Sequence, residues 1–401
     1  MTSVALSLAF DVLCLAVSFV FFWSTFVVLI GLVKPVRRHP AAGSRLRFAV
    51  LVCARNEEQV IRLPVKSVLM SRYPADRRKI IVLADNCTDE TVARARAAGA
   101  EVWEKTTPSE GKGDVLAWGI RRVCASGGFD AIAVFDADNI VSDGWFDAMN
   151  DALQDGETVV TGRRCSSNAR ANVISGWYTV YWDMMNELSN RVRTSLGLSG
   201  KLTGTGFAFL LSALGDDGWQ TETMVEDVEF TVQTNLRGNR VAYVPAADYA
   251  DEQPETVRYM WRQLRRWATG GWQVAARYFA PWAKGLRARP SLRLFDCFFA
   301  ILTGMSVSFI LLFNVLAFLV RLAAGQADAH ARAVFLGVFG FVFVMGWFTA
   351  VASVALSPDK RRPRLRAILT FPVFSLILAS AVLYTLVRPT RAWKPIPHGG
   401  G

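Results

Sequence analysis

Two carboxylates stand two positions apart at the end of an apolar run. The run DAIAVFDAD covers 130–138 and ends in Asp136 and Asp138. A pair of this kind can bind a hard divalent cation together with a diphosphate, because Mg²⁺ in proteins is usually held by one or two carboxylates and substrate phosphates. A solvated turn would show the same spacing. The place of the pair directly after an apolar strand favours the metal site.

A second acidic pair is the best source of a general base. The histidines are His39, His330 and His398, and none lies in the core of the long polar middle region. The base must then be a carboxylate, Lys, Tyr or Cys. The stretch TETMVEDVEFT contains Glu226 and Asp227 among apolar residues, and we take Asp227 as the candidate. The alternative is one charge on an acidic helix face.

A cluster of arginine and tryptophan fills MWRQLRRWATGGW, residues 260–272. If 257–273 is a helix, Gln263, Arg266 and Trp267 stand at i, i+3 and i+4 and share one face. Arg266 can then donate a planar fork to a phosphate, Trp267 can cover a sugar ring, and Gln263 can bind a hydroxyl or phosphate oxygen. The alternative is a helix on the membrane surface with Arg and Trp at the interface. Different faces can satisfy both, the membrane face holding Trp261, Arg265 and Trp272.

Alternating strands and helices would position these residues. Short apolar runs predict strands at 48–54, 79–85 and 130–138, with another beginning near Ala100, and helical patterns separate them. This order predicts an α/β fold with a doubly wound, mostly parallel sheet. Ligands of such sheets bind at the carboxyl ends of the strands. The polar ends Ala54-Arg55-Asn56-Glu57 and Asp85-Asn86 should therefore meet Asp136 and Asp138.

The strand ends offer a candidate nucleotide contact but no glycine-rich phosphate loop. Asp85 could accept a hydrogen bond from a base or ribose, or it could cap the helix that follows. The glycine-rich phosphate loops G-x-G-x-x-G and G-x-x-x-x-G-K-[ST] are both missing from the sequence. Other residues must therefore hold any phosphate.

Four stretches without charge predict membrane spans: 12–33, 297–320, 333–358 and 367–387. Each is long enough to cross a hydrocarbon core of about 30 Å. The expected organisation is one N-terminal transmembrane helix (1–33), a catalytic domain (34–255), a segment with Gln263, Arg266, Trp267 and interfacial helices (256–293), and three transmembrane helices with a tail (294–401).

Basic residues predict the orientation. They gather at 34–38 and 360–366, whereas only Arg321 and Arg332 separate the second and third spans. The positive-inside rule then predicts a multi-pass protein of the cell membrane (inner or plasma membrane), with the large domain in the cytoplasm. The net charge of +11 does not indicate nucleic acid, because the basic segment 255–293 directly precedes a span and suits anionic membrane lipids. The cysteines show no C-x-x-C pair and are expected to be free thiols.

The motifs together resemble those of a known family. ARNEE, ADNCTDET, EGKGDVLAWGI, FDAD, GTGFAFL, TETMVEDVEFT and QLRRW occur in this order over about 48–275. They resemble the family-2 glycosyltransferases, and more narrowly the membrane-embedded branch with a D, D-x-D, E-D, Q-x-x-R-W signature. That branch contains cellulose, hyaluronan, chitin-oligosaccharide and poly-N-acetylglucosamine synthases and ceramide glucosyltransferase.

The resemblance implies a GT-A-like nucleotide-diphospho-sugar transferase fold and inverting transfer from a UDP-sugar. By resemblance, Asp85 would contact the uridine and Lys112 the phosphates, and Asp136 and Asp138 would bind the nucleotide and Mg²⁺ or Mn²⁺. Asp227 would be the base and Arg266 would stabilise the leaving group. The full set expected to bind substrate is Ala54, Asn56, Glu57, Asp85, Lys112, Asp136, Thr205, Glu226, Gln263 and Trp267.

The sequence motifs do not decide which molecule accepts the sugar. The first hypothesis is a processive synthase of a β-linked polysaccharide or oligosaccharide, and the alternative is transfer of one sugar to a lipid. Cellulose itself is disfavoured, because Ala84 replaces an acid that many relatives carry, and a gating loop and cyclic-dinucleotide domain are missing. A catalytically dead scaffold is disfavoured by the intact acidic residues. Four spans make a narrow channel, so a homo-oligomer or an export partner is possible.

Overall fold

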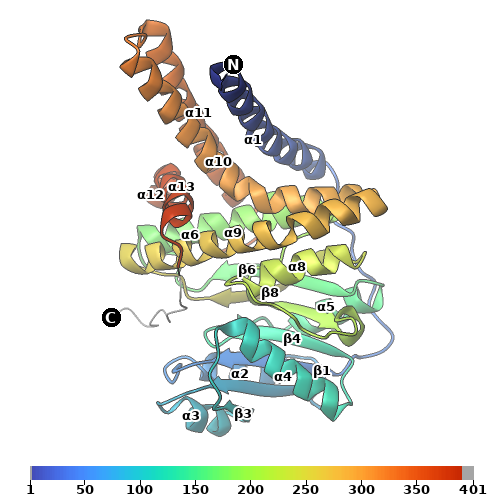
Figure 1. Cartoon of the computed structure of the whole chain (residues 1–401). Helices are drawn as coiled ribbons and strands as arrows, with labels where there is room; N and C mark the ends of the chain where they lie inside the picture. Colours follow the sequence, from blue (N-terminus) through green and yellow to red (C-terminus); the bar gives the residue numbers. More distant parts are fainter. Residues whose placement is uncertain (1, 391–401) are drawn as a thin grey trace.

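The computed structural model describes residues 2–390 and the side chains of residues 15 and 17–390. Its centre is an eight-stranded sheet of order β3-β2-β1-β4-β7-β6-β8-β5 (Figure 1). The first four of these strands are parallel to one another. They are β1 (Phe48–Ala54), β2 (Arg78–Asp85), β3 (Glu101–Lys105) and β4 (Ala131–Asp136). The strands predicted from the sequence are therefore confirmed.

The other half of the sheet mixes directions. β7 (Phe207–Leu210) runs antiparallel between β4 and β6 (Val159–Ser166), and β8 (Val241–Asp251) is parallel to β6. The edge strand β5 (Ile140–Val141) is antiparallel to β8. The expectation of a mostly parallel α/β sheet is confirmed, with β7 and β5 as the antiparallel members.

Both faces of the sheet are covered, which explains the continuous apolar runs. Along β1, Phe48, Val50 and Val52 pack with helices α2 (Arg62–Leu69) and α5 (Trp145–Gln154). Ala49 and Leu51 point to the other face, toward α4 (Lys112–Ser126) and α8 (Glu226–Leu236). A strand buried on both sides shows no alternation of polar and apolar residues. The small helix α3 (Thr91–Ala97) is followed by Gly99 at φ 102°, a left-handed conformation that glycine commonly adopts just after a helix.

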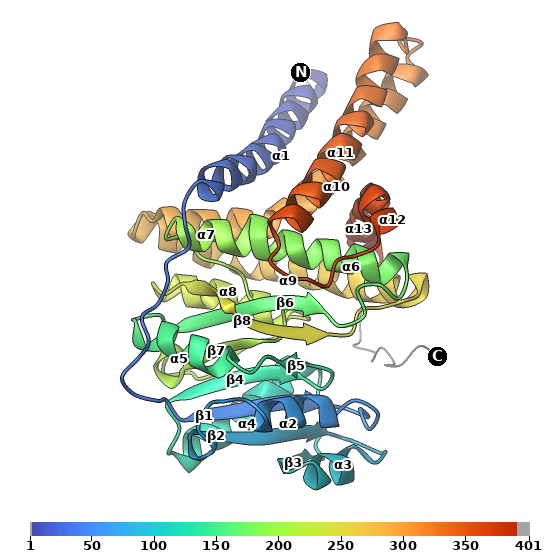
Figure 2. The same cartoon turned by 180° about the vertical axis from the view of Figure 1, so that it is seen from behind.

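A layer of helices lies between the sheet and the helices within 2–32 and 292–387 (Figure 2). It contains α6 (Val173–Asp183), the π-helix η2 (Met184–Arg191), α7 (Val192–Ser195) and α9 (Val257–Ala288). The helix predicted for 257–273 is thus confirmed, and it continues through Pro281 to Ala288. Its inner face packs through the buried residues Met260 and Leu264.

Among the described residues, two helices are long and apolar enough to cross a membrane. They are α10 (Leu292–Ala323) and α11 (Ala329–Leu356), with mean hydropathies of 2.1 and 2.2. Two further apolar helical segments are shorter: Val17–Leu32 of α1 (Thr2–Leu32) and the helix α13 (Phe371–Val387). The short helix α12 (Leu365–Leu369) precedes α13. The second and third predicted spans therefore agree with the structure, whereas the first and fourth stay predictions. The predicted tail, 391–401, lies outside the described residues.

A buried ion pair joins α7 to α10. Arg193 of α7 donates from Nε to Asp296 Oδ2 of α10 at 2.9 Å, and both side chains are buried. Trp23 of α1 donates from Nε1 to Asp296 Oδ1 at 3.0 Å. Breaking a buried pair leaves an uncompensated charge, so these contacts hold the three helices in one arrangement.

Candidate active site

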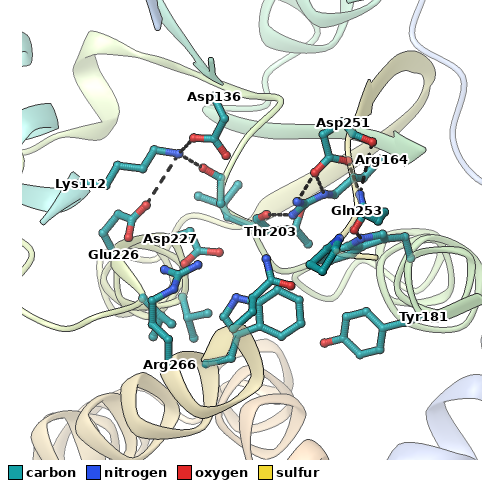
Figure 3. A pocket seen from close by; sticks show the side chains of 18 of the residues that line it. Lys112, Asp136, Arg164, Tyr181, Thr203, Glu226, Asp227, Asp251, Gln253 and Arg266 are labelled. Carbon is teal, nitrogen blue, oxygen red and sulfur yellow. Dashed lines mark hydrogen bonds and ion pairs between the residues drawn. The ribbon is translucent and has the colours of Figure 1, made fainter. Parts of the chain in front are cut away.

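One large cavity lies between the carboxyl ends of the strands and the inner face of α9 (Figure 3). The predicted meeting of the polar strand ends is confirmed, since residues from the ends of β1, β2 and β4 all line it. Residues of α8 and α9 complete the wall. The predicted residues that line it are Ala54, Glu57, Asp85, Lys112, Asp136, Asp138, Glu226, Asp227, Gln263, Arg266 and Trp267.

Two predicted substrate-binding residues lie outside this lining. Thr205 is fully buried. Its Oγ1 accepts a hydrogen bond from the backbone of Asp136 at 2.9 Å and donates to Asn139. Asn56, at φ 56°, accepts from the backbone of Thr88 at 2.8 Å. Both side chains therefore position neighbouring strand ends, and their direct contact with substrate stays a prediction.

Asp85 is held in the cavity by neighbours from three segments. Ser109 Oγ lies 2.6 and 2.8 Å from its two carboxylate oxygens, Asn86 donates at 2.8 Å, and Arg55 forms an ion pair with it. Capping of α3 is not its role, because the backbone of Thr91 donates to Asp89 instead, at 3.0 Å. Asp85 is thus a fixed hydrogen-bond acceptor at the end of β2.

Lys112 links the acidic groups at the centre of the site. Its ammonium donates to Asp136 Oδ1 and, at 2.6 Å, to the backbone oxygen of Gly204, and it lies 3.9 Å from Glu226 Oε1. Burial alone would lower the pKa of Lys112, but the charges of Asp136 and Glu226 outweigh it and the pKa is raised. The ammonium therefore stays charged beside the position expected for the donor phosphates.

The donor set suits a hard cation. Asp136 and Asp138 supply carboxylate oxygens to one cavity, and Asp138 also accepts from the backbone of Glu252 at 3.1 Å. Across the described residues no group of three or more His, Cys, Asp or Glu side chains could hold a metal by itself. A Mg²⁺ or Mn²⁺ ion here would thus need substrate oxygens as further ligands, which is the usual arrangement for Mg²⁺ with phosphates.

The acidic pair Glu226 and Asp227 opens α8, where the positive end of the helix dipole favours negative charge. Burial raises the pKa of Asp227, while the backbone of Val228 and the cations of Lys112, Lys201 and Arg266 lower it in part. Burial also raises the pKa of Glu226 to about 7, partly against Lys112. A buried carboxylate with a raised pKa is a stronger base, and Asp227 has this property inside the cavity.

The predicted face of α9 points into the same cavity. Gln263 Oε1 is buried and finds no hydrogen-bond partner within the described part of the chain, so a donor from a ligand would satisfy it. Arg266 donates to the backbone oxygen of Met224 at 3.3 Å. The ring of Trp267 stacks on Tyr181 at 5.7 Å and 22°, and Trp182 meets it edge-on at 5.6 Å.

The sequence patterns do not predict a polar network that lies at the ends of β6 and β8. Arg164 pairs with Asp251, with Nε 3.1 Å from Oδ2, and lies 3.8 Å from the ring centre of Trp182. Gln253 joins Asp251 at 2.7 Å and Trp182 at 2.8 Å (Figure 3). These residues line the cavity. The strand-end rule would have found Arg164 and Asp251 had β6 and β8 been predicted, because both close parallel strands.

The comparison with known families decides the identity. Residues 45–270, more than half of the chain, match the family described as "Glycosyltransferase like family 2". The chain belongs to this family. It is therefore a glycosyltransferase, as the resemblance in its motifs predicted.

Relatives of this family 2 glycosyltransferase agree. The "Probable glycosyltransferase YdaM" of Bacillus subtilis (strain 168) is 28% identical over 328 residues, which is 78% of this chain and 75% of the relative. The poly-beta-1,6-N-acetyl-D-glucosamine synthase of Staphylococcus aureus (strain COL) is 26% identical over 258 residues. That match spans 63% of this chain and 61% of the synthase.

A solved structure shows the same fold. The mannosyltransferase PcManGT from Pyrobaculum calidifontis, determined in complex with GDP-Man and Mn²⁺, superposes with a TM-score of 0.57. The match is 16% identical and covers 95% of this chain and 98% of that chain. It therefore extends beyond the catalytic domain to most of the helices around it.

Proposed function

We propose that this glycosyltransferase moves a sugar from a UDP-sugar to an acceptor hydroxyl at the membrane surface, with inversion at the anomeric carbon. One observation carries the proposal. A buried carboxylate with a raised pKa, Asp227, shares one cavity with the pair Asp136 and Asp138 and with the Gln263–Arg266–Trp267 face of α9. That combination supplies a base, a site for a diphosphate and a surface for a sugar.

Each of these residues has a separate role in the reaction. Asp227 accepts the proton of the acceptor hydroxyl, whose oxygen attacks the anomeric carbon in line as the bond to UDP breaks. Arg266 and Lys112 offset the negative charge that develops on the diphosphate. A bound Mg²⁺ or Mn²⁺, held by Asp136 and Asp138, would supply further charge neutralisation. In-line displacement on an α-linked donor gives a β-linked product.

The first candidate acceptor is a growing β-linked saccharide, extended processively. The aromatic cluster of Trp267, Tyr181 and Trp182 supports it, because flat apolar rings suit the C–H faces of sugars. The match to a poly-N-acetylglucosamine synthase also supports it, although the chain spans only 61% of that relative. Because few helices surround the site, export of a long product would need a second copy of the chain or an export partner.

A second candidate acceptor is a lipid that receives one sugar. The part of the cavity wall that α10 and α13 form favours this candidate. Ile301 and Met305 of α10 and Leu378 and Val382 of α13 line it, and all are apolar. Product size separates the two candidates: the purified full chain in lipid is incubated with each radiolabelled UDP-sugar and Mg²⁺ or Mn²⁺. A polymer supports the first, and one sugar on a lipid supports the second.

We expect turnover to require a divalent cation. An excess of chelator should abolish sugar transfer, and added Mn²⁺ or Mg²⁺ should restore it, because two carboxylates beside a diphosphate repel it unless a cation intervenes. Asp138→Asn should raise the cation concentration needed for half-maximal activity. Full activity in chelator would contradict the assignment of Asp136 and Asp138.

We further propose that the chain is a multi-pass protein of the cell membrane with the catalytic domain in the cytoplasm. The basic residues at 360–366, on the side of the catalytic domain, support this orientation. The proposed boundaries near 255 and 293 lie close to the starts of α9 at Val257 and α10 at Leu292. The basic segment between them would contact anionic membrane lipids.

Protease treatment of sealed vesicles tests the orientation. In inside-out vesicles, protease should remove an epitope inserted in the catalytic domain, because that domain should face the medium. In right-side-out vesicles the same epitope should be protected. The reverse pattern would invert the topology.

A further inference from the structure

The two sides of the cavity differ in polarity. Its sheet side is formed by charged and polar strand ends, whereas its membrane side is apolar. The residues that α10 and α13 contribute to it are Ile301, Gly304, Met305, Leu378 and Val382. None of these side chains can form a hydrogen bond with a sugar hydroxyl. This part of the cavity therefore suits a hydrocarbon chain better than a saccharide.

Two cations of the cavity, Lys201 and Arg266, form no ion pair with a carboxylate in the described part of the chain. The backbone of Lys201 is fixed by Asn190, which accepts at 2.8 Å and donates at 3.0 Å. Lys201 is one of the residues that line the cavity. Within the part of the chain that the structure describes, the Lys201 ammonium forms neither a hydrogen bond nor an ion pair. Burial lowers the pKa of Lys201, and Asp227 opposes the shift.

Three other cations of the cavity form ion pairs with carboxylates. Arg55 pairs with Asp85, Lys112 with Asp136, and Arg164 with Asp251. Arg266 is assigned to the leaving diphosphate. Lys201 lines the same cavity as Asp227 of α8 and Ile301 of α10. An ammonium that has no carboxylate partner and stands beside an apolar wall favours an anionic ligand.

We propose that the acceptor is a membrane lipid that carries both a hydroxyl and a phosphate, and that Lys201 binds this phosphate. The hydroxyl then reaches Asp227, and the hydrocarbon chain lies against Met305 of α10 and Val382 of α13. The inference rests on the proposed function and specifies the lipid acceptor of its second candidate.

The transfer step is balanced without a further reactant. The O–H bond of the lipid hydroxyl breaks and its proton goes to Asp227, while the oxygen forms a bond to the anomeric carbon. The bond from that carbon to the UDP oxygen breaks, and its electron pair leaves with UDP. The phosphate of the lipid takes no part in bond making, so Lys201 is a binding residue for the acceptor.

Two kinds of lipid have this chemistry: a glycerolipid with a phosphodiester and free hydroxyls, and a sugar linked to a lipid through a diphosphate. The full chain is placed in phosphatidylcholine vesicles with one acceptor at a time. The acceptors are phosphatidylglycerol, a polyprenyl-diphosphate-linked sugar, diacylglycerol, which has a hydroxyl but no phosphate, and a soluble oligosaccharide. Label from the UDP-sugar is followed into the organic phase and into water-soluble product.

We expect one of the phosphate-bearing lipids to accept sugar best. Lys201→Met should lower kcat/KM for that lipid by about 10–100-fold, the scale of a lost hydrogen bond to a charged group. Transfer to diacylglycerol should change little, and UDP binding should be retained. Lys201→Arg should restore most of the loss. The matched control is Lys66→Met on the exposed surface of α2, which removes one charge far from the cavity.

Three outcomes would overturn the inference. An equal loss of transfer to diacylglycerol and to the phosphate-bearing lipids would show that Lys201 acts on Asp227 and not on the acceptor. Extension of the soluble oligosaccharide without label in any lipid would leave the proposed glycosyl transfer intact and remove the lipid acceptor. Absence of transfer to every acceptor would remove the proposed function as well.

Discussion

Asp227→Asn should lower kcat by about 10²–10⁴-fold, the usual contribution of general-base catalysis. The amide keeps the shape of the carboxylate but cannot accept the proton of the acceptor hydroxyl. UDP binding should be retained, because the side chain acts on the acceptor. Turnover in lipid and calorimetric binding of UDP, measured on the same preparation, check both halves of the prediction.

The pH dependence follows from the burial of the same residue. Asp227 must be ionised to act as a base, so kcat/KM should rise with pH through the pKa of the free enzyme. Because burial raises this pKa, the acid limb should lie above the value of about 3.9 for an exposed aspartate. Activity is then lost as pH falls through the raised pKa. This limb should vanish from the residual activity of Asp227→Asn.

Glu226→Gln is the control for these experiments, since Glu226 is the neighbouring buried carboxylate of the same helix turn. Its loss should be smaller and should affect UDP-sugar binding, because Glu226 lies 3.9 Å from Lys112 on the donor side. Near-normal turnover of Asp227→Asn would contradict the assignment, and Glu226 would become the next candidate. Loss of UDP binding in Asp227→Asn, with binding intact in Asp136→Ala, would contradict it too.

The sequence was informative wherever a local pattern had a direct spatial meaning. β1, β2 and β4 are buried on both faces, so their apolar runs were visible and their polar ends had to meet at one edge. The three residues Gln263, Arg266 and Trp267 share a helix face through their spacing alone. These two rules predict which strand ends and which helix face line the cavity.

The polar network of Arg164, Asp251 and Gln253 depends on contacts between distant segments, which no local pattern reports. β7 has only four residues, too few for a clear period, and the parallel pair β6 and β8 is separated by more than seventy residues. The pairing of Arg164 with Asp251 is therefore invisible in the sequence. Thr205 shows the opposite case: it has a motif position typical of a ligand contact, but packing buries it behind Asp136.

Arg266→Ala should lower kcat by about 10²–10³-fold, the scale for one preorganised donor to developing negative charge. Its guanidinium contacts the backbone oxygen of Met224 and faces the cavity beside Glu226 and Asp227. Arg266→Lys should lose less, because the charge is kept and only the planar fork is removed. Trp267→Ala should instead raise the KM for the acceptor, because an indole ring offers no charge to a diphosphate. Steady-state rates over a range of acceptor concentrations separate the two effects.

Arg265→Ala is the matched control, because the two arginines are neighbours on α9 with opposite surroundings. Arg265 lies 4.8 Å from the ring centre of Tyr384 in α13 and donates to the backbone of Arg388, away from the cavity. A general loss of positive charge or of helix stability would affect both variants alike. Only a direct role at the leaving diphosphate makes Arg266→Ala slow while Arg265→Ala keeps its turnover. Equal losses in both variants would therefore move the stabilisation of UDP to Lys112 and the bound cation.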